Sequence, residues 1–209
     1  MSPRSDFSPR SDGSSLPEAS TRRRRPRADA QRNRESLLTA ARDAFRAGAD
    51  PETVSLEAIA RDAGVGIGTL YRNFPTRQDL AAAVYRSQLD DVVASAGTLL
   101  RTGEPAAAAF RAWADRYAAF VATKRGMADT LRRLMSSGEV ARTDTRAQIR
   151  GTVEKFLHAG AADGSLRADV QADDVVSTLL GVFLATADTT DRDQTDRILD
   201  LLLDGLRPR

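Results

Sequence analysis

Apolar residues recur along most of this chain at the three- and four-residue intervals that place side chains on one face of an α-helix. No segment shows the alternation of apolar and polar residues that is typical of a β-strand. The pattern predicts an all-α protein. Six helices are expected at about residues 29–48, 76–103, 105–124, 126–138, 143–164 and 193–206. Three more are expected: one that begins at Ser55, a very short one after Val65, and one that is apolar on nearly all sides and is capped by Asp173 or Asp174.

Several of these helices begin at residues that favour a helix start. Asp29, Ser55 and Thr76 each carry a side-chain oxygen that accepts hydrogen bonds from free backbone N–H groups. Thr76 and Asp79 form an acidic version of the capping box. Residues 1–27 are different, because they are rich in Ser, Pro and Arg and have no apolar period. We expect them to be a disordered basic arm.

The composition removes several classes of function. The 209 residues include no cysteine and one histidine, which excludes disulfides, cysteine-rich zinc sites and multi-histidine metal sites. No apolar run reaches the length of a membrane span, and the N-terminal segment lacks the apolar core of a secretory signal. No pairing of a nucleophile with a base is visible. We therefore expect a soluble, cytoplasmic protein that is not an enzyme, has no cofactor and has no membrane partner.

The charge is unevenly distributed along the chain. The formal net charge is only +2. Residues 1–34, however, contain nine basic and four acidic residues. This basic end predicts a polyanionic partner, and the rest of the chain does not.

Three glycines, Gly64, Gly66 and Gly68, alternate with Val65 and Ile67 further along the chain. A dinucleotide-binding loop needs a preceding strand and G-x-G-x-x-G spacing, and a Walker loop needs a following lysine, so both interpretations fail here. A helix-turn-helix explains the glycines better. Gly64 supplies the turn, while Gly66 and Gly68 keep the start of the second helix slim enough to approach a phosphate backbone closely.

The segment "SLEAIARDAGVGIGTLYRNFPTRQDL", residues 55–80, resembles the DNA-binding domain of the tetracycline-repressor (TetR) family of bacterial regulators. The resemblance covers about residues 28–85 and implies three domains: the arm at 1–27, a three-helix DNA-binding domain at 28–75, and a helical effector-binding and dimerisation domain at 76–209. It also implies a homodimer that places one recognition helix per subunit in the major groove of operator DNA. Usually such a regulator represses transcription, and a small molecule releases it.

The resemblance also assigns roles to individual residues. Ser55, Thr69, Tyr71 and Arg77 match positions that contact phosphates, with arginine replacing the more usual lysine at position 77. Asn73 stands where the family usually has histidine. Gly66, Ile67 and Arg72 lie on or near the face that reads bases. The basic arm adds Arg22, Arg23, Arg24, Arg25 and Arg27 as candidate DNA contacts.

Aromatic residues form a stripe at helical spacing in the C-terminal domain. Phe110, Trp113, Tyr117 and Phe120 share one face of the helix predicted at 105–124. Core packing alone explains such a stripe, but Trp and Tyr also need a polar partner, which a ligand could supply. The candidate residues for an effector of unknown identity are Trp113, Tyr117, Phe120, Met127, Leu131 and Met135.

The last two predicted helices carry more apolar residues than one core-facing stripe requires. We expect them to pair with their copies in a symmetric four-helix interface. The candidate interface residues are Val176, Leu180, Phe183, Ile198, Leu202 and Leu206.

The best-supported function is a ligand-responsive repressor that binds an inverted-repeat operator as a homodimer. A transcriptional activator of the same fold is the first alternative. A helical dimerisation module that does not bind DNA and a nucleotide-binding enzyme that uses the glycines are two others.

Overall fold

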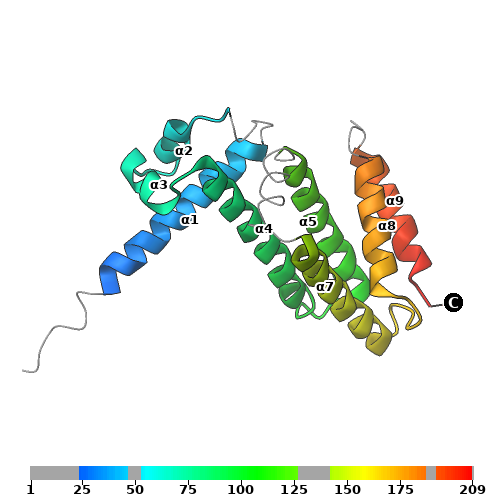
Figure 1. The fold of residues 1–209 in the computed structure, drawn as a ribbon. Coiled ribbons are helices and arrows are strands. Elements are labelled where there is room, and N and C mark those ends of the chain that lie inside the picture. Colours follow the sequence, from blue (N-terminus) through cyan, green and yellow to red (C-terminus); the bar gives the residue numbers. More distant parts are fainter. Residues whose placement is uncertain (1–23, 47–52, 127–141, 187–191, 209) are drawn as a thin grey trace, which may run out of the picture.

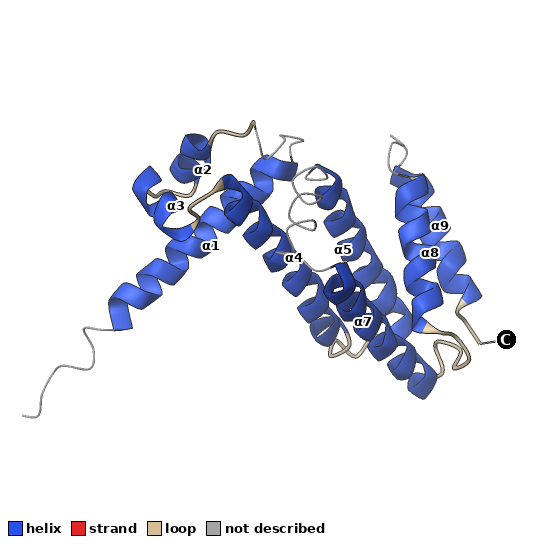
Figure 2. Ribbon diagram, viewed as in Figure 1, coloured by secondary structure: helices blue, strands red, loops and turns tan. Residues whose placement is uncertain are grey.

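The structure is a computed structural model that describes residues 24–46, 53–126, 142–186 and 192–208. All regular secondary structure in these ranges is helical, which confirms the predicted all-α fold (Figures 1 and 2). The helices are α1 (Arg24–Arg46), α2 (Leu56–Asp62), α3 (Ile67–Asn73), α4 (Arg77–Leu99), α5 (Ala106–Gly126), α7 (Arg142–Asp163), α8 (Ala172–Ala185) and α9 (Arg192–Gly205). The helix predicted at 126–138 lies outside the described residues.

Two of the predicted caps are confirmed. The Ser55 side chain accepts a hydrogen bond from the backbone N–H of Ala58, at the start of α2. Thr76 and Asp79 form both hydrogen bonds of a capping box at the start of α4. These caps fix where the chain enters each helix, because they satisfy N–H groups that have no partner within the helix.

Two other predicted helix starts are wrong. Helix α1 begins at Arg24 and not at Asp29, which lies inside the helix and forms an ion pair with Arg32. Pro26 is tolerated in the first turn because the N–H group that it lacks would have no partner there. The N-cap of α8 is Gln171, so that Asp173 and Asp174 lie in the first turn, where they complement the helix dipole.

Helices α1, α2 and α3 form a compact head at one end of the molecule (Figure 1). Its core contains Leu37, Phe45, Ile59, Leu70 and Phe74, all almost fully buried. The Arg34 guanidinium of α1 lies 4.6 Å from the centre of the Phe74 ring, so a cation–π contact also joins α1 to the end of α3. This packing leaves the opposite side of α3 facing outward.

Helices α4, α5, α7, α8 and α9 form the body, and α4 runs from the head into it (Figure 1). The aromatic stripe of α5 is the centre of its core. The ring centres of Trp113 and Tyr117 lie 5.3 Å apart, those of Tyr117 and Phe183 5.5 Å apart, and those of Trp113 and Phe156 5.6 Å apart. One continuous hydrophobic core therefore links head and body.

Candidate nucleic-acid interface

The turn between α2 and α3 is closed by backbone hydrogen bonds. Gly64 has a positive φ of 69°, which glycine adopts without the strain that a side chain would add. The N–H of Gly64 donates to the Arg61 carbonyl at 3.0 Å, and the N–H of Val65 donates to the Ala60 carbonyl at 2.9 Å. This is the Schellman arrangement, and it sets the direction in which α3 leaves the turn.

Helix α3 buries one side and exposes the other. Leu70 is fully buried, whereas Ile67 is 37% exposed and Tyr71 47% exposed. Gly66, Gly68 and Arg72 are exposed as well. The candidate base-reading residues Gly66, Ile67 and Arg72 thus lie together on the outward side of the head.

The protein itself does not require glycine at positions 66 and 68. Neither residue has a positive φ. A Cβ atom added at Gly66 would meet no atom within 4 Å, and one added at Gly68 would meet only the Arg72 guanidinium at 3.9 Å. Glycine is common at an N-cap, which is the position of Gly66 in α3. Close approach of an outside partner to the backbone is a second physical reason for glycine at both positions.

Two polar side chains of α3 are bonded to their own helix. The Arg72 Nε donates to the Gly68 carbonyl at 3.0 Å, which leaves the terminal amino groups of the guanidinium facing outward. The Asn73 amide donates to the Thr69 carbonyl at 2.8 Å and is half-buried. The amide nitrogen of Asn73 has a second N–H, which can still donate to a phosphate.

The starts of α2 and α4 lie side by side. A guanidinium nitrogen of Arg77 donates to the Val54 carbonyl, directly before Ser55. The Ser55 hydroxyl donates to the Glu57 carboxylate at 3.1 Å. The pKa of the Glu57 carboxyl is lowered, first by a hydrogen bond from its own backbone N–H and then by the Ser55 hydroxyl. The candidate phosphate contacts Ser55 and Arg77 therefore share one edge of the head, next to an ionised acid.

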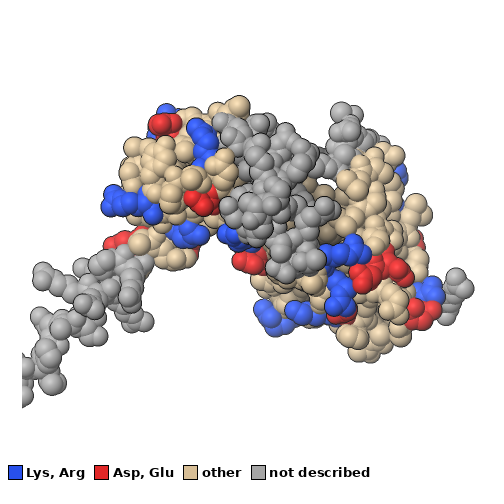
Figure 3. Space-filling model, viewed as in Figure 1, with Lys and Arg blue, Asp and Glu red and all other residues tan. Residues whose placement is uncertain are grey.

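Basic side chains lie over the exposed surface of the head in the view of Figure 3, with acidic side chains beside them. The head is thus not uniformly basic. Of the arm, Arg24, Arg25 and Arg27 belong to the first turn of α1, while Arg22 and Arg23 lie outside the described residues.

Three of the six candidate effector residues lie within the described part of the chain. Trp113 is fully buried, and its indole N–H donates to the Val92 carbonyl at 3.1 Å, so core packing accounts for it completely. Tyr117 is also buried, and burial raises the pKa of its hydroxyl. Phe120 alone of these three lines a pocket between α1, α4 and α5. Met127, Leu131 and Met135 lie outside the described residues.

Some of the candidate interface residues are buried within the chain, and others are partly exposed. Val176, Phe183 and Leu206 are buried within the chain and cannot present an apolar surface, whereas Leu180, Ile198 and Leu202 are half-buried. The sequence prediction did not include Leu184, which is 67% exposed, and Leu201, which is 70% exposed. Helices α8 and α9 stand side by side at the end of the body away from the head (Figure 1).

No group of metal-binding side chains occurs among the residues that the structure describes. Within the same ranges, no helix is long and apolar enough to cross a membrane.

Comparisons with known proteins agree with this architecture. Residues 37–84 match the family model described as bacterial regulatory proteins, tetR family. Residues 104–208 match the model of the C-terminal domain of SbtR-like transcriptional regulators.

Solved structures extend the similarity over the whole fold. The chain is 41% identical to the TetR transcriptional regulator SCO0520 from Streptomyces coelicolor, over 84% of this chain and 98% of that one, with a TM-score of 0.76. It is 32% identical to a TetR transcription regulatory protein from Mycobacterium vanbaalenii, over 88% and 99% of the two chains, with a TM-score of 0.69.

A curated relative matches over a shorter region. The HTH-type transcriptional regulator SAR0097 of Staphylococcus aureus (strain MRSA252) is 36% identical over 69 residues, which are 33% of this chain and 36% of that protein. The chain thus spans about a third of the curated relative.

Proposed function

Because the chain belongs to the TetR family of bacterial regulators, we propose that it is a sequence-specific DNA-binding transcriptional regulator that acts as a homodimer on an inverted-repeat operator. The observation that carries this proposal is the outward face of α3. That face has two glycines that neither backbone conformation nor packing requires, next to an exposed arginine. A slim, partly basic helix face suits the major groove of DNA.

The alternatives are less well supported by the same geometry. A nucleotide-binding loop needs a strand before its glycines, and here helix α2 precedes them. A helical dimerisation module would not need an exposed Arg72 beside two glycines. An activator of the same fold would bind DNA in the same way, and the genes that it controls would distinguish it from a repressor.

We further propose that a small molecule releases the protein from DNA, as is usual in the family. The two binding events are then thermodynamically linked. If the small molecule weakens DNA binding by some factor, typically about 5–150-fold, operator DNA must weaken the binding of the small molecule to the protein by the same factor.

The direct test is a band shift with the DNA upstream of the protein's own gene, followed by footprinting. The sharpest variant is Gly68→Ala. The added methyl group meets no packed atom within the chain, and alanine is preferred to glycine inside a helix by about 0.5–1 kcal/mol. The variant should therefore be as stable as the wild type or slightly more stable, yet bind the operator more weakly.

Gly151→Ala is the matched control. Gly151 lies within α7, and a Cβ atom there also meets nothing within 4 Å. This control should leave operator affinity unchanged. Full operator affinity in Gly68→Ala would show that the start of α3 does not approach DNA closely.

A further inference from the structure

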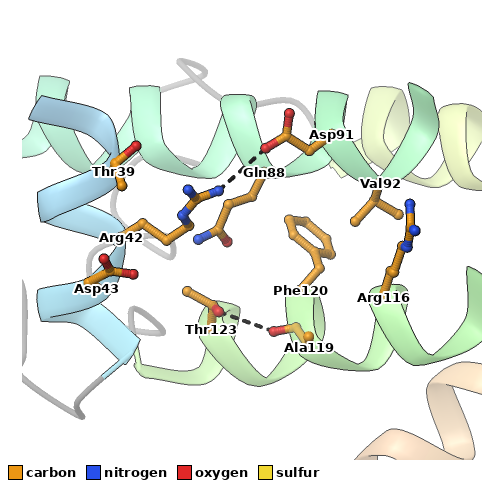
Figure 4. A pocket seen from close by; sticks show the side chains of 10 residues that line it. All are labelled: Thr39, Arg42, Asp43, Gln88, Asp91, Val92, Arg116, Ala119, Phe120 and Thr123. Atoms are coloured by element: carbon orange, nitrogen blue, oxygen red, sulfur yellow. Dashed lines mark hydrogen bonds and ion pairs between the residues drawn. The ribbon is translucent and has the colours of Figure 1, made fainter. Parts of the chain in front are cut away.

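A pocket opens where the head meets the body. It has a volume of about 350 Å³ and is lined by helix α1 of the head and by helices α4 and α5 of the body (Figure 4). We call it the junction pocket; Arg42, Asp43, Gln88, Arg116, Phe120 and Thr123 are the lining residues used below. This volume lies in the range of small-molecule sites.

Gln88 is the most informative residue of the junction pocket. It is only 8% exposed, and its amide forms no hydrogen bond with any part of the chain that the structure describes. Within the same residues, no side-chain nitrogen or oxygen is both enclosed and unpaired, so the Gln88 amide must reach open space, where water or a ligand can bond with it. Figure 4 shows it pointing into the junction pocket.

The sequence itself marks Gln88 as unusual, because it is a polar residue in an apolar stripe. Gln88 stands between Val84 and Val92 at a spacing of four residues, on the stripe of α4 that faces inward. A polar residue in an apolar stripe is normally paired. The amide of Gln88 has no such partner in the described part of the chain and is therefore a free polar group in the wall of the junction pocket, available to a molecule that enters from outside.

The other walls of the junction pocket have distinct chemistry. Asp43 and Thr123 lie near the Gln88 amide, and Thr123 still has acceptor capacity because its hydroxyl donates to the Ala119 carbonyl at 3.1 Å. The ring of Phe120 forms an apolar middle section. Arg116 lies on the other side of that ring from Gln88 (Figure 4). The pocket therefore has a hydrogen-bonding end, an apolar centre and a cationic end.

The charges of the lining favour a ligand with a single carboxylate. Arg42 of α1 is already paired with Asp91 of α4 at 3.5 Å, and Asp43 of α1 adds a second carboxylate to the lining. Two acids thus balance two arginines around the pocket. One carboxylate can bind Arg116 without strong repulsion, whereas a doubly charged phosphate would be repelled more strongly by Asp43 and Asp91.

From this arrangement we propose that the junction pocket is an effector site for a short carboxylic acid that carries an amino or hydroxyl group at its other end. The carboxylate binds Arg116, the methylene chain lies against Phe120, and the distal group bonds with Gln88, Asp43 and Thr123. The site uses only Phe120 of the aromatic stripe of α5, because Trp113 and Tyr117 belong to the core.

The position of the pocket gives such a ligand a means of control. A molecule held by Asp43 of α1, Gln88 of α4 and Arg116 of α5 touches the head and the body together. Any change in the angle between head and body changes these contacts, so the ligand binds one arrangement better than the other. This regulatory step, unlike the binding itself, rests on the proposed DNA-binding function.

The first experiment measures binding without DNA. Isothermal titration uses ω-amino and ω-hydroxy carboxylic acids of about four to eight carbons. The controls of equal length are the unsubstituted acids, which lack the distal group, and the amino alcohols and diols, which lack the carboxylate of the ω-amino and ω-hydroxy acids respectively. At least one ω-substituted acid should bind about tenfold or more tightly than both its controls, a factor that corresponds to one good polar contact.

Variants then locate the site. Gln88→Leu keeps the size of the side chain and removes the amide, and Arg116→Ala removes the cation; each should weaken binding about tenfold or more. Arg101→Ala, an exposed residue beyond the end of α4, should leave it unchanged. Circular dichroism verifies that each variant folds. Because the chain has no cysteine, Thr123→Cys also gives a single thiol whose alkylation the bound acid should slow.

The outcomes separate the two proposals. If none of the acids binds, or if binding survives both Gln88→Leu and Arg116→Ala, the junction pocket is not their site. If an acid binds there but the protein binds no DNA, the proposed function is wrong and the site stands. A band shift with the acid present, which should show weakened operator binding, then tests the link between them.

Discussion

Arg72 is the side chain whose role in reading DNA is most sharply testable. Its Nε is tied to the Gly68 carbonyl, so the terminal amino groups remain for a partner. If they form a bidentate contact with guanine, Arg72→Ala should cost about 1–3 kcal/mol and relax sequence preference at one operator position. Affinities for a set of single-base operator variants measure both effects.

Thr69→Ala is the matched control for Arg72. The Thr69 hydroxyl is a candidate phosphate contact, and a phosphate contact carries no base information. This variant should weaken binding to all operators alike. If Arg72→Ala also weakens binding uniformly, without any change in preference, Arg72 contacts only the phosphate backbone.

Individual residues also show what a one-dimensional pattern predicts and what it does not. Periodicity correctly indicated that Trp113 faces inward, but not that its N–H has a partner, because the Val92 carbonyl comes from another helix. Periodicity likewise could not separate Val176 from Leu184. Both are apolar residues of α8, yet the first is buried in the core and the second is exposed. Only the packing of neighbouring helices decides which apolar side stays uncovered.

Among the helices, the link between α5 and α9 depends on one charged cluster. Arg111 of α5 bonds with Asp115 of its own helix and, across to α9, with Asp196 at 2.9 Å and Asp200 at 2.8 Å. Burial alone would lower the pKa of Arg111, but the hydrogen bonds that its guanidinium donates to the three carboxylates raise it above its usual value, so Arg111 stays charged. The arginine thus joins the effector-domain core to a candidate interface helix.

Arg111→Ala should therefore lower the free energy of unfolding by about 1.5–3 kcal/mol, the range of hydrogen bonds to charged groups, because it leaves three carboxylates without their common cation. Urea denaturation measures the loss. Arg207→Ala removes an exposed pair with Asp204 at 3.3 Å and should cost only about 0.2–1 kcal/mol. Equal losses of unfolding free energy in the two variants would show that the Arg111 cluster stabilises the fold no more than an exposed ion pair does.

Helix starts were predictable where the cap is local. Ser55 and Thr76 find their partners within three residues, and both predictions are confirmed. Asp29 has the right chemistry but lies inside α1, which begins earlier at Arg24. Nothing in the sequence at Asp29 shows that the helix already begins five residues before it, at Arg24. The junction pocket depends on three helices at once and is correspondingly absent from the sequence prediction.

At the scale of the whole molecule, exposed leucines on α8 and α9 support the proposed homodimer. Leu184 and Leu201 expose most of their apolar surface at the end of the body away from the head. Exposed apolar residues on neighbouring helices are typical of an interface. Leu184→Arg and Leu201→Arg should weaken the dimer and, with it, operator binding.

Light scattering coupled to size-exclusion chromatography measures this change in mass. Ala161→Arg, an exposed position on α7, should leave the dimer intact. A wild-type protein that is monomeric at all concentrations would contradict the four-helix interface.

The basic arm extends the proposed DNA contact beyond the head. Arg22, Arg23, Arg24, Arg25 and Arg27 stand before or within the first turn of α1, and in a dimer they occur twice. Arginines next to a helix-turn-helix can lie along phosphates or enter a narrow minor groove. Each phosphate neutralised releases counterions and adds about 0.9 to the slope of log affinity against log salt.

Replacing these five arginines with glutamine keeps the chain length and avoids deleting the first turn of α1. The variant should bind operator more weakly at low salt and flatten the salt slope by several units per dimer, at about 0.9 for each lost contact. Preference among operators should change little, except at bases that flank the half-sites. Arg101→Gln, in the body, is the control. Salt titrations of operator affinity that run parallel for wild type and variant would show that the arm makes no net ionic contact and is only a solvated tail.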